Sequence, residues 1–378
     1  MIVSNTFLQY FSDYTTRSVI LGSAFLGIIA GTLGTFAVLR KQSLLGDAVS
    51  HAALPGIALA FIVTGEKNHL VFILGALIAG WLATVFFMGI IKTTRIKSDS
   101  ALGIILSVFF GFGILLLTYI QKMQNAAQAG IEKFLFGQAA AIILSDIITM
   151  AVFGLFVLLI LLLFWKEFKL MVFNPEFASA AGFNVNFLDI VLTGLIVISI
   201  VIGLQTVGVI LMSSMLVSPA TAARQWTEKL GVMALLGAVF GALAGIIGAM
   251  VSAGFEKIPT GPVIIIVISV IVIISLFFAP NRGILWVYLK RVKQSRKIRT
   301  EAVLLDLYEL SKQHQNGYHH SHDIKTISIM TQNINSVQRT LKALATTGLA
   351  EENPKGKWRL TPEGFQSVEN LVKNIQKL

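Results

Sequence analysis

Residues 261–279 read GPVIIIVISVIVIISLFFA, and this stretch decides the fold class because it runs for 19 residues without a charged side chain. A transmembrane helix needs about 20 predominantly apolar residues. Further apolar runs lie near residues 17–38, 46–64, 70–91, 101–120, 140–165, 187–204, 207–223 and 230–252. The run at 207–223 is the weakest, because it holds Ser213, Ser214, Ser218 and Pro219, and a broken or re-entrant helix is an alternative there. We therefore expect an all-α polytopic membrane protein with eight or nine transmembrane helices.

The composition of the whole chain agrees with this expectation. The chain has 378 residues, of which 55% are hydrophobic and 13% charged, whereas soluble domains are about 45–50% apolar and about 25% charged. Its mean hydropathy is +0.78. It has no cysteine, which excludes disulfides, thiolate metal sites and cysteine nucleophiles. The first sixteen residues lack a basic region, so we expect no cleavable signal peptide.

Lysine and arginine in the loops between the runs predict the orientation of the chain, because cytoplasmic loops are enriched in both. The larger set comprises Arg40, Lys41, Lys92, Arg95, Lys97, Lys166, Lys169, Arg224 and Lys229. The smaller set comprises Arg17, Lys67, Lys122, Lys133 and Lys257. If the larger set is cytoplasmic and nine helices cross, the N-terminus lies outside and the C-terminus inside.

The second apolar run begins with two ionisable residues, Asp47 and His51. Four residues apart on a helix, they project from one face. Carboxylate oxygen and imidazole nitrogen both bind Mn, Fe and Zn, and ionisable residues within membrane spans usually mark a pathway or a site. The spacing leaves an alternative open, in which Asp47 faces Arg40 and Lys41 at the helix end and His51 is satisfied by a neighbouring helix.

Residues 282–378 form a chain of a different kind. They hold 16 Lys and Arg against 8 Asp and Glu, whereas residues 1–281 hold 14 against 11. We expect a transmembrane domain at 1–283, a connector at 284–298 and a cytoplasmic domain at 299–378. Helical periodicity marks 299–313 and 333–347, and the turn at 353–356 predicts a β-hairpin before a last helix that begins after Thr361.

Three motifs resemble one known family. Residues 46–61, GDAVSHAALPGIALAF, resemble the signature of the permease subunits of metal ABC transporters, the manganese, zinc and iron importers. Residues 174–182, NPEFASAAG, resemble the segment of these permeases that docks on the ATPase, and the matching positions are Asn174, Pro175, Glu176, Ala178 and Gly182. Residues 208–222 resemble a later segment of the family that contains glycine and proline. The resemblance covers roughly residues 15–280.

This resemblance implies a permease subunit that moves Mn, Zn or Fe into the cytoplasm across a bacterial inner membrane, without catalysing a reaction itself. Asp47 and His51 would coordinate the transported ion, and no cofactor would be bound permanently. The implied partners are a cytoplasmic ATPase, an extracytoplasmic metal-binding protein and a second permease subunit, identical or different. The sequence has no G-x-x-x-x-G-K-[ST] motif, so ATP hydrolysis is expected in a partner chain. Permeases for vitamin B12 or siderophores share the docking segment, but their large substrates do not need the Asp47–His51 pair.

The tail resembles a winged helix-turn-helix module, so the expected architecture adds a small cytoplasmic α+β domain. In this interpretation 333–347 is the recognition helix, and Gln338, Arg339, Lys342, Lys357 and Arg359 could contact nucleic acid. The alternatives are a protein-docking or dimerisation module and a basic tail that faces anionic lipid. A histidine-rich tract suggests a cytoplasmic metal sensor, with a simple polar loop as its alternative; the tract contains His314, His319, His320 and His322. A second hypothesis for the whole chain is thus a membrane-anchored, metal-responsive transcription regulator with a permease-like sensor.

Overall fold

The computed structural model describes residues 14–65, 69–122, 144–255, 258–280, 282–312, 321–331 and 334–375. Contacts divide the chain into two compact units, residues 1–284 and 285–378. Each unit has a hydrophobic core of its own.

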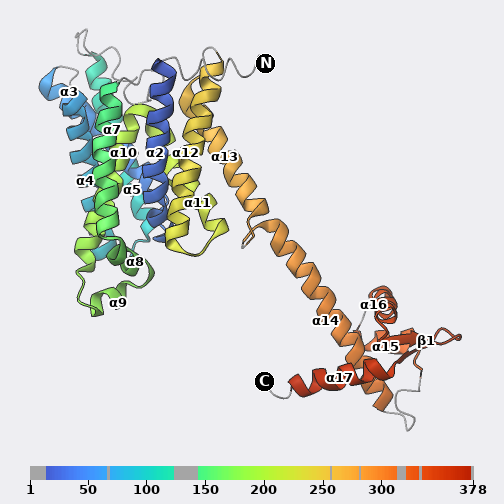
Figure 1. Ribbon diagram of the computed structural model, residues 1–378. Helices are drawn as coiled ribbons and strands as arrows, with labels where there is room; N and C mark the ends of the chain where they lie inside the picture. Colours follow the sequence, from blue (N-terminus) through green and yellow to red (C-terminus); the bar gives the residue numbers. More distant parts are fainter. Residues whose placement is uncertain are drawn as a thin grey trace. The chain divides into compact units, whose positions relative to one another are not determined.

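The first unit is a bundle of long helices (Figure 1). They are α2 (Tyr14–Leu39), α3 (Leu45–Thr64), α4 (His69–Thr93), α5 (Ser98–Lys122), α7 (Leu144–Leu163), α10 (Val185–Val207), α11 (Val209–Trp226), α12 (Leu230–Gly254) and α13 (Thr260–Phe278). Two short helices, α8 (Trp165–Phe173) and α9 (Pro175–Ala180), separate α7 from α10. Within the described residues, eight helices are long and apolar enough to cross a membrane, and α11 is not among them. The prediction of a polytopic helical membrane protein is therefore confirmed.

The weakest apolar run forms a separate helix, α11. The chain breaks between α10 and α11 at Gly208, whose φ of 87° and ψ of 168° suit glycine and strain any other residue. Pro219 lies inside α11 without ending it. Met212, Met215 and Leu216 are fully buried, so the helix is held among protein neighbours, as backbone irregularity at membrane depth requires.

Glycines bring α2 and α12 into direct backbone contact. A Cβ atom on Gly27 would lie 2.2 Å from the carbonyl oxygen of Gly241, and one on Gly31 would lie 2.2 Å from that of Gly237. Both pairs leave no room for a side chain. Such close approach is how small residues stabilise helix pairs in membranes, so the glycines of α12 serve packing.

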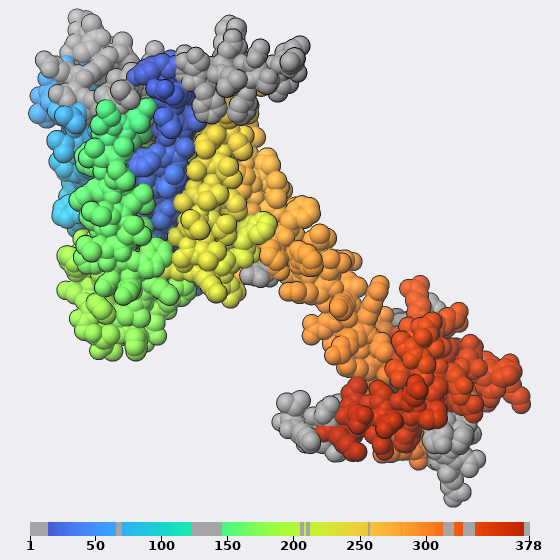
Figure 2. All heavy atoms as spheres, in the orientation of Figure 1, coloured from blue at the N-terminus to red at the C-terminus, as the bar shows by residue number. Residues whose placement is uncertain are grey.

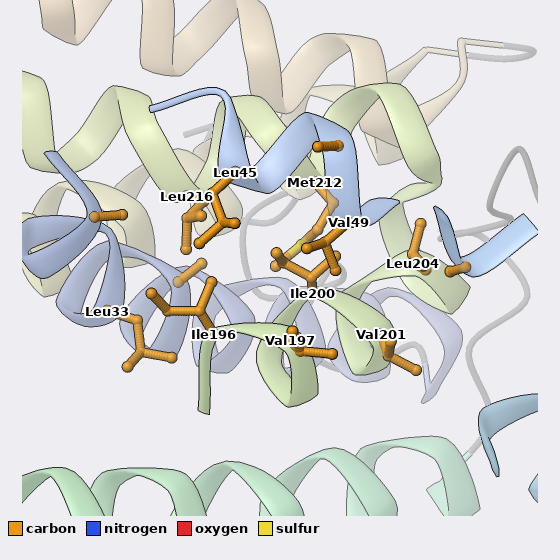
Figure 3. Close-up of a cluster of buried hydrophobic side chains, with 14 of the residues drawn as sticks. Leu33, Leu45, Val49, Ile196, Val197, Ile200, Val201, Leu204, Met212 and Leu216 are labelled. Atoms are coloured by element: carbon orange, nitrogen blue, oxygen red, sulfur yellow. The ribbon is translucent and has the colours of Figure 1, made fainter. Parts of the chain in front are cut away.

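The core of the first unit lies where α2, α3, α10 and α11 meet, and Figure 3 shows its side chains. Leu45 and Val49 of α3 point into this cluster and are 1% and 2% exposed. Their neighbours from the other helices are equally buried; these are Leu33, Ile196, Ile200, Met212 and Leu216. Apolar packing thus fixes the first two turns of α3.

The described residues of the second unit form helices α14 to α17 and a small antiparallel sheet. Its elements are α14 (Ile284–Lys312), α15 (Ile324–Thr331), α16 (Ile334–Thr346), β1 (Ala350–Glu352), β2 (Trp358–Leu360) and α17 (Pro362–Ile375). Strands β1 and β2 pair with Ala350 opposite Leu360, and His322 adds an isolated bridge to Trp358. Trp358 is 2% exposed and packs with the apolar faces of α14, α16 and α17.

Two local features of this unit follow from its sequence. The Thr361 hydroxyl accepts a hydrogen bond from the Gly364 N–H at 3.1 Å, which caps α17, and Pro362 occupies the first position of the helix. The stretch predicted as a connector, 284–298, forms the first part of α14, which continues from Ile284 through Lys312 as one helix. Its last turns carry Val303, Leu304 and Leu307 into the core.

Candidate functional site

The start of α3 places Asp47 and His51 together. Asp47 lies in the first turn and His51 one turn later, and the Nε2 atom of His51 is 3.5 Å from the Oδ1 atom of Asp47. The side chain of Asp47 is 36% exposed and that of His51 19% exposed. A separation of 3.5 Å is at the outer limit of a hydrogen bond, so neither group saturates the other.

Neighbouring helices shape the surroundings of this pair. The ring of Phe110 on α5 meets the His51 imidazole edge-on, with 4.7 Å between the centroids. The Nδ1 atom of His51 is buried and has no hydrogen-bond partner among the described residues, and the same holds for the Ser50 hydroxyl. Leaving a buried polar atom unsatisfied costs about 1–3 kcal/mol. The imidazole therefore retains binding capacity that the fold itself does not use.

The glycine that precedes Asp47 seats the start of α3 against α11. A Cβ atom on Gly46 would lie 3.1 Å from the Cδ2 atom of Leu216 and 3.3 Å from the Cα atom of Ser213. A larger residue would push the first turn of α3, and with it Asp47, away from the bundle. The Gly-Asp order of the motif thus combines close packing with a carboxylate at the helix start.

The alternative interpretation, in which Asp47 faces Arg40 and Lys41 at the helix end, finds no support at Arg40. Arg40 follows α2 and turns to α10, where its Nη2 atom forms an ion pair with Asp189 and its Nη1 atom donates to the Thr193 hydroxyl at 3.3 Å. Arg40 is thus occupied by another carboxylate. Within the described residues no group of three or more His, Cys, Asp or Glu side chains gathers to hold a metal. Asp47 and His51 are therefore two candidate donors in one chain.

The predicted docking segment forms α9 at one end of the bundle, next to α8 (Figure 1). The Asn174 side chain caps α9 by accepting a hydrogen bond from the Phe177 N–H at 2.9 Å, and Pro175 is the first residue of the helix. Ala178 is fully buried, Glu176 is exposed, and Gly182 ends the segment with a φ of 90°. The segment is therefore locally determined and presents one face outward.

Aromatic side chains on this segment were missed by motif matching. Phe173, Phe177 and Phe183 are 54%, 58% and 40% exposed, although they follow the charged residues Lys166, Glu167 and Lys169. Aromatic residues in a short charged loop are the signal that could have identified them, since they are enriched where proteins associate.

The remaining predicted site residues belong to the second unit. Gln338, Arg339 and Lys342 lie exposed on α16 and Lys357 is exposed before β2. Arg359 donates to the Glu351 carboxylate at 2.6 Å across the hairpin. His322 is buried, and its backbone N–H and C=O both bond to Trp358 at 2.8 Å. His314, His319 and His320 lie outside the described residues.

Comparisons with known proteins identify a family and several relatives. The model of the ABC 3 transport family matches residues 12–279. The zinc transport system membrane protein TroC of Treponema pallidum is 47% identical over 76% of this chain and 97% of its own length. The manganese transport system membrane protein MntC of Bacillus subtilis is 39% identical over 93% of this chain and 80% of its own. Because the first unit has 284 residues, the match to this relative extends into the second unit.

A solved structure supports the fold. A chain of PsaBC from Streptococcus pneumoniae, determined in complex with Fab, superposes with a TM-score of 0.66 at 33% identity, covering 77% of this chain and 99% of that one. The family match spans more than half of the chain and includes both the Asp47–His51 pair and the α9 segment. The chain belongs to the ABC 3 transport family.

Proposed function

We propose that this chain is the permease subunit of an ABC importer that moves a divalent transition metal ion into the cytoplasm of a bacterium. The observation that carries the proposal is the Asp47–His51 pair, one carboxylate and one imidazole a helical turn apart with an unsatisfied nitrogen on the imidazole. The relatives named above are a zinc and a manganese transport protein, so we place these two ions ahead of iron.

The chemistry of the pair suits transport better than storage. A dication needs its hydration shell replaced by oxygen and nitrogen ligands, and a transported ion must bind weakly enough to leave again. Two donors per chain leave most of the shell unfilled. A second permease subunit, related by a dimer axis, would contribute another carboxylate and another imidazole and bring the number of protein ligands to four.

The remaining partners are assigned by the same reasoning. The α9 helix, with Phe177 exposed beside Glu176, offers a compact face on which a separate ATPase subunit can dock. The ends of α2 and α4 meet the start of α10 through Arg40–Asp189 and Lys92–Asn186, so these basic residues share one end of the bundle with α9. We assign this end to the cytoplasm, and the opposite end to an extracytoplasmic metal-binding protein.

Uptake of radiolabelled manganese and zinc by the reconstituted transporter tests the metal site. Asp47→Asn and His51→Gln keep the shape of each side chain and remove its metal-binding form, so uptake is expected to fall to background while the ATPase still co-purifies. Asp99→Asn is the matched control, because Asp99 is an exposed aspartate in the first turn of α5. Uptake at the wild-type rate in both site variants would remove Asp47 and His51 from the translocation path.

For the second unit we propose a winged-helix module. Three features support this assignment. The elements follow in the order α14, the His322 bridge, α15 and α16, and the β1–β2 hairpin comes next. The third feature is the exposed face of α16, with Gln338, Arg339 and Lys342. We place protein docking ahead of nucleic-acid binding on this unit, because Arg359 is occupied by Glu351.

Deleting residues 299–378 separates the two hypotheses for the whole chain. A permease with an added regulatory module retains metal uptake after the deletion. A membrane-anchored transcription regulator would show no uptake in either form, and its full chain would retard double-stranded DNA in a manner weakened by Arg339→Gln and Lys342→Gln.

A further inference from the structure

A groove on the side of the first unit has features that metal transport does not use. It encloses about 740 Å³ between α2, α7, α8 and α12. In Figure 2 the surface of α2 is visible between that of α7 and that of α12. Both flanking helices pack against α2, and the groove is the space that they leave between them.

Small side chains create this space. Gly231, Ala234 and Ala238 face the groove from α12, and Thr32 contributes to it from α2. The Thr32 hydroxyl is already bonded to the Ile28 carbonyl oxygen at 2.6 Å, which leaves its methyl group as the available surface. The inner wall is therefore apolar and smooth.

The rim of the groove is apolar and faces outward. Leu162 and Leu163 of α7 are 67% and 73% exposed, and Leu235 of α12 is 65% exposed. On a spanning helix such exposed residues meet acyl chains or an apolar face of another subunit. The groove thus opens outward between α7 and α12.

One end of the groove is polar, unlike the rest. Trp165, Lys166 and Glu167 of α8 line it there. The Oε2 atom of Glu167 is buried and has no hydrogen-bond partner among the described residues. A carboxylate oxygen removed from water without a partner is costly. Lys166 forms no ion pair with it within the described part of the chain and is exposed.

We propose that this groove binds one phospholipid whose headgroup carries a primary ammonium, as in phosphatidylethanolamine. Glu167 accepts a hydrogen bond from the ammonium, Lys166 pairs with the phosphate, and one acyl chain lies between α7 and α12. Trp165 sits at the level of the headgroup, where tryptophan is enriched in membrane proteins. The occupant holds α8 in place, and α8 leads directly into α9.

The charges select this occupant. A zwitterionic headgroup presents a cation and an anion a few ångströms apart, which matches the acid and the base that both line this end of the groove. An anionic lipid without an amine would leave Glu167 unsatisfied. A trimethylated headgroup carries the cation but has no N–H to donate, so comparing the two amines isolates the hydrogen bond to Glu167 from simple charge attraction.

Native mass spectrometry of the full transporter complex, exchanged into nanodiscs of defined composition, tests the proposal. The wild type is expected to retain one phosphatidylethanolamine per permease chain and to prefer it over phosphatidylcholine by about tenfold, which corresponds to one charge-assisted hydrogen bond of about 1.4 kcal/mol. Glu167→Gln should lose this preference, and Ala234→Leu should expel the lipid by filling the groove.

Two controls keep the test decisive. Glu228→Gln removes an acid at the start of α12 that pairs with Arg282 outside the groove, and it should retain the full preference. Because the chain has no cysteine, Leu235→Cys can be oxidised without side reactions. A disulfide-linked permease dimer would show that a second copy occupies the groove. That result, or an equal affinity for both lipids in the wild type, would overturn the proposal.

Discussion

Near one end of the first unit lie two pairs that each join a carboxylate to a nitrogen-bearing side chain. The two pairs differ in how completely their polar atoms are hydrogen-bonded. Arg40 and Asp189 form a direct ion pair, and the second Arg40 nitrogen donates to Thr193. Asp47 and His51 stand 3.5 Å apart, and one imidazole nitrogen has no partner among the described residues. Both pairs contain one carboxylate and one nitrogen base, and both lie at helix ends.

The difference distinguishes an ion pair that holds two helices together from the pair that we propose as a metal site. The Arg40–Asp189 pair joins the end of α2 to the start of α10, and its side chains are only 13% and 24% exposed. Thr193 is a further partner of Arg40, so these groups serve contacts within the fold. The Asp47–His51 pair forms no ion pair with another helix within the described residues, and beyond α3 the His51 ring meets only the ring of Phe110 edge-on, so the buried Nδ1 atom keeps its hydrogen-bonding capacity. Ionic groups in a membrane protein can therefore be sorted by how completely they are satisfied, and not only by their presence.

The largest loss of stability is expected when the Arg40–Asp189 ion pair is broken. Arg40→Gln leaves the Asp189 carboxylate without its cation in a mostly buried position, and such single deletions cost about 3 kcal/mol or more. Thermal unfolding of the purified protein in detergent should show a clearly lowered midpoint. The double variant Arg40→Gln/Asp189→Asn should recover much of the loss, because no unpaired charge remains.

The same measurement on the binding pair sharpens the comparison. Asp47→Asn and His51→Gln should shift the unfolding midpoint much less than Arg40→Gln, because the pair contributes little to packing at 3.5 Å. A loss as large as that of Arg40→Gln would mean that the two pairs are both structural, and would weaken the metal-site proposal.

A smaller change in stability, this time a gain, is expected on replacing Asp306 in the second unit. Burial raises the pKa of the Asp306 carboxyl, and the negative charge of Glu309 raises it further. The folded state therefore disfavours the charged carboxylate. The free energy of unfolding falls as the pH rises from the unfolded-state pKa through the raised folded-state pKa. Asp306→Asn should therefore stabilise the unit at pH 7 by less than about 1 kcal/mol, since the group is only partly buried.

Hydrogen exchange of the amides around Val303 and Leu307 in the full chain measures this gain. The gain should vanish below about pH 4, where the aspartate is protonated in both the folded and the unfolded chain. Glu301→Gln serves as a control on the same helix. Glu301 lies outside the buried cluster and pairs with Lys297. A gain that persists at low pH would assign the effect to packing instead of charge.

The smallest effect is expected at the exposed pair of the hairpin. Arg359 and Glu351 are 35% and 48% exposed, and surface pairs of this kind contribute about 0.2–1 kcal/mol. Glu351→Gln should lower the stability of the second unit by about 0.5 kcal/mol, and 0.5 M salt should remove most of the difference between variant and wild type. A salt-independent loss would indicate that the pair is more buried than its exposure suggests.

Sequence patterns anticipated the spans because each is a local property. An uninterrupted apolar run such as 261–279 has to bury its backbone polar groups as a helix wherever it lies in a membrane. The start of the last helix after Thr361 was equally readable, since a cap depends on residues within one turn. The cap that Asn174 provides to α9 has the same local origin but was found only in the structure. The separation of α10 from α11 was also expected, because the runs 187–204 and 207–223 are distinct, but the exact break at Gly208 and the continuation of α11 through Pro219 came from the structure.

By itself the sequence determined that the chain crosses a membrane, roughly where each apolar helix lies, and that Asp47 and His51 share one helical face. Only the tertiary structure decided that Arg40 turns to Asp189 and leaves Asp47 alone, that one His51 nitrogen lacks a partner among the described residues, and that a groove ends at Glu167. The reason is physical. Helical periodicity fixes neighbours within about one turn, whereas the partner of a buried charge is set by which helices pack together across more than a hundred residues of chain.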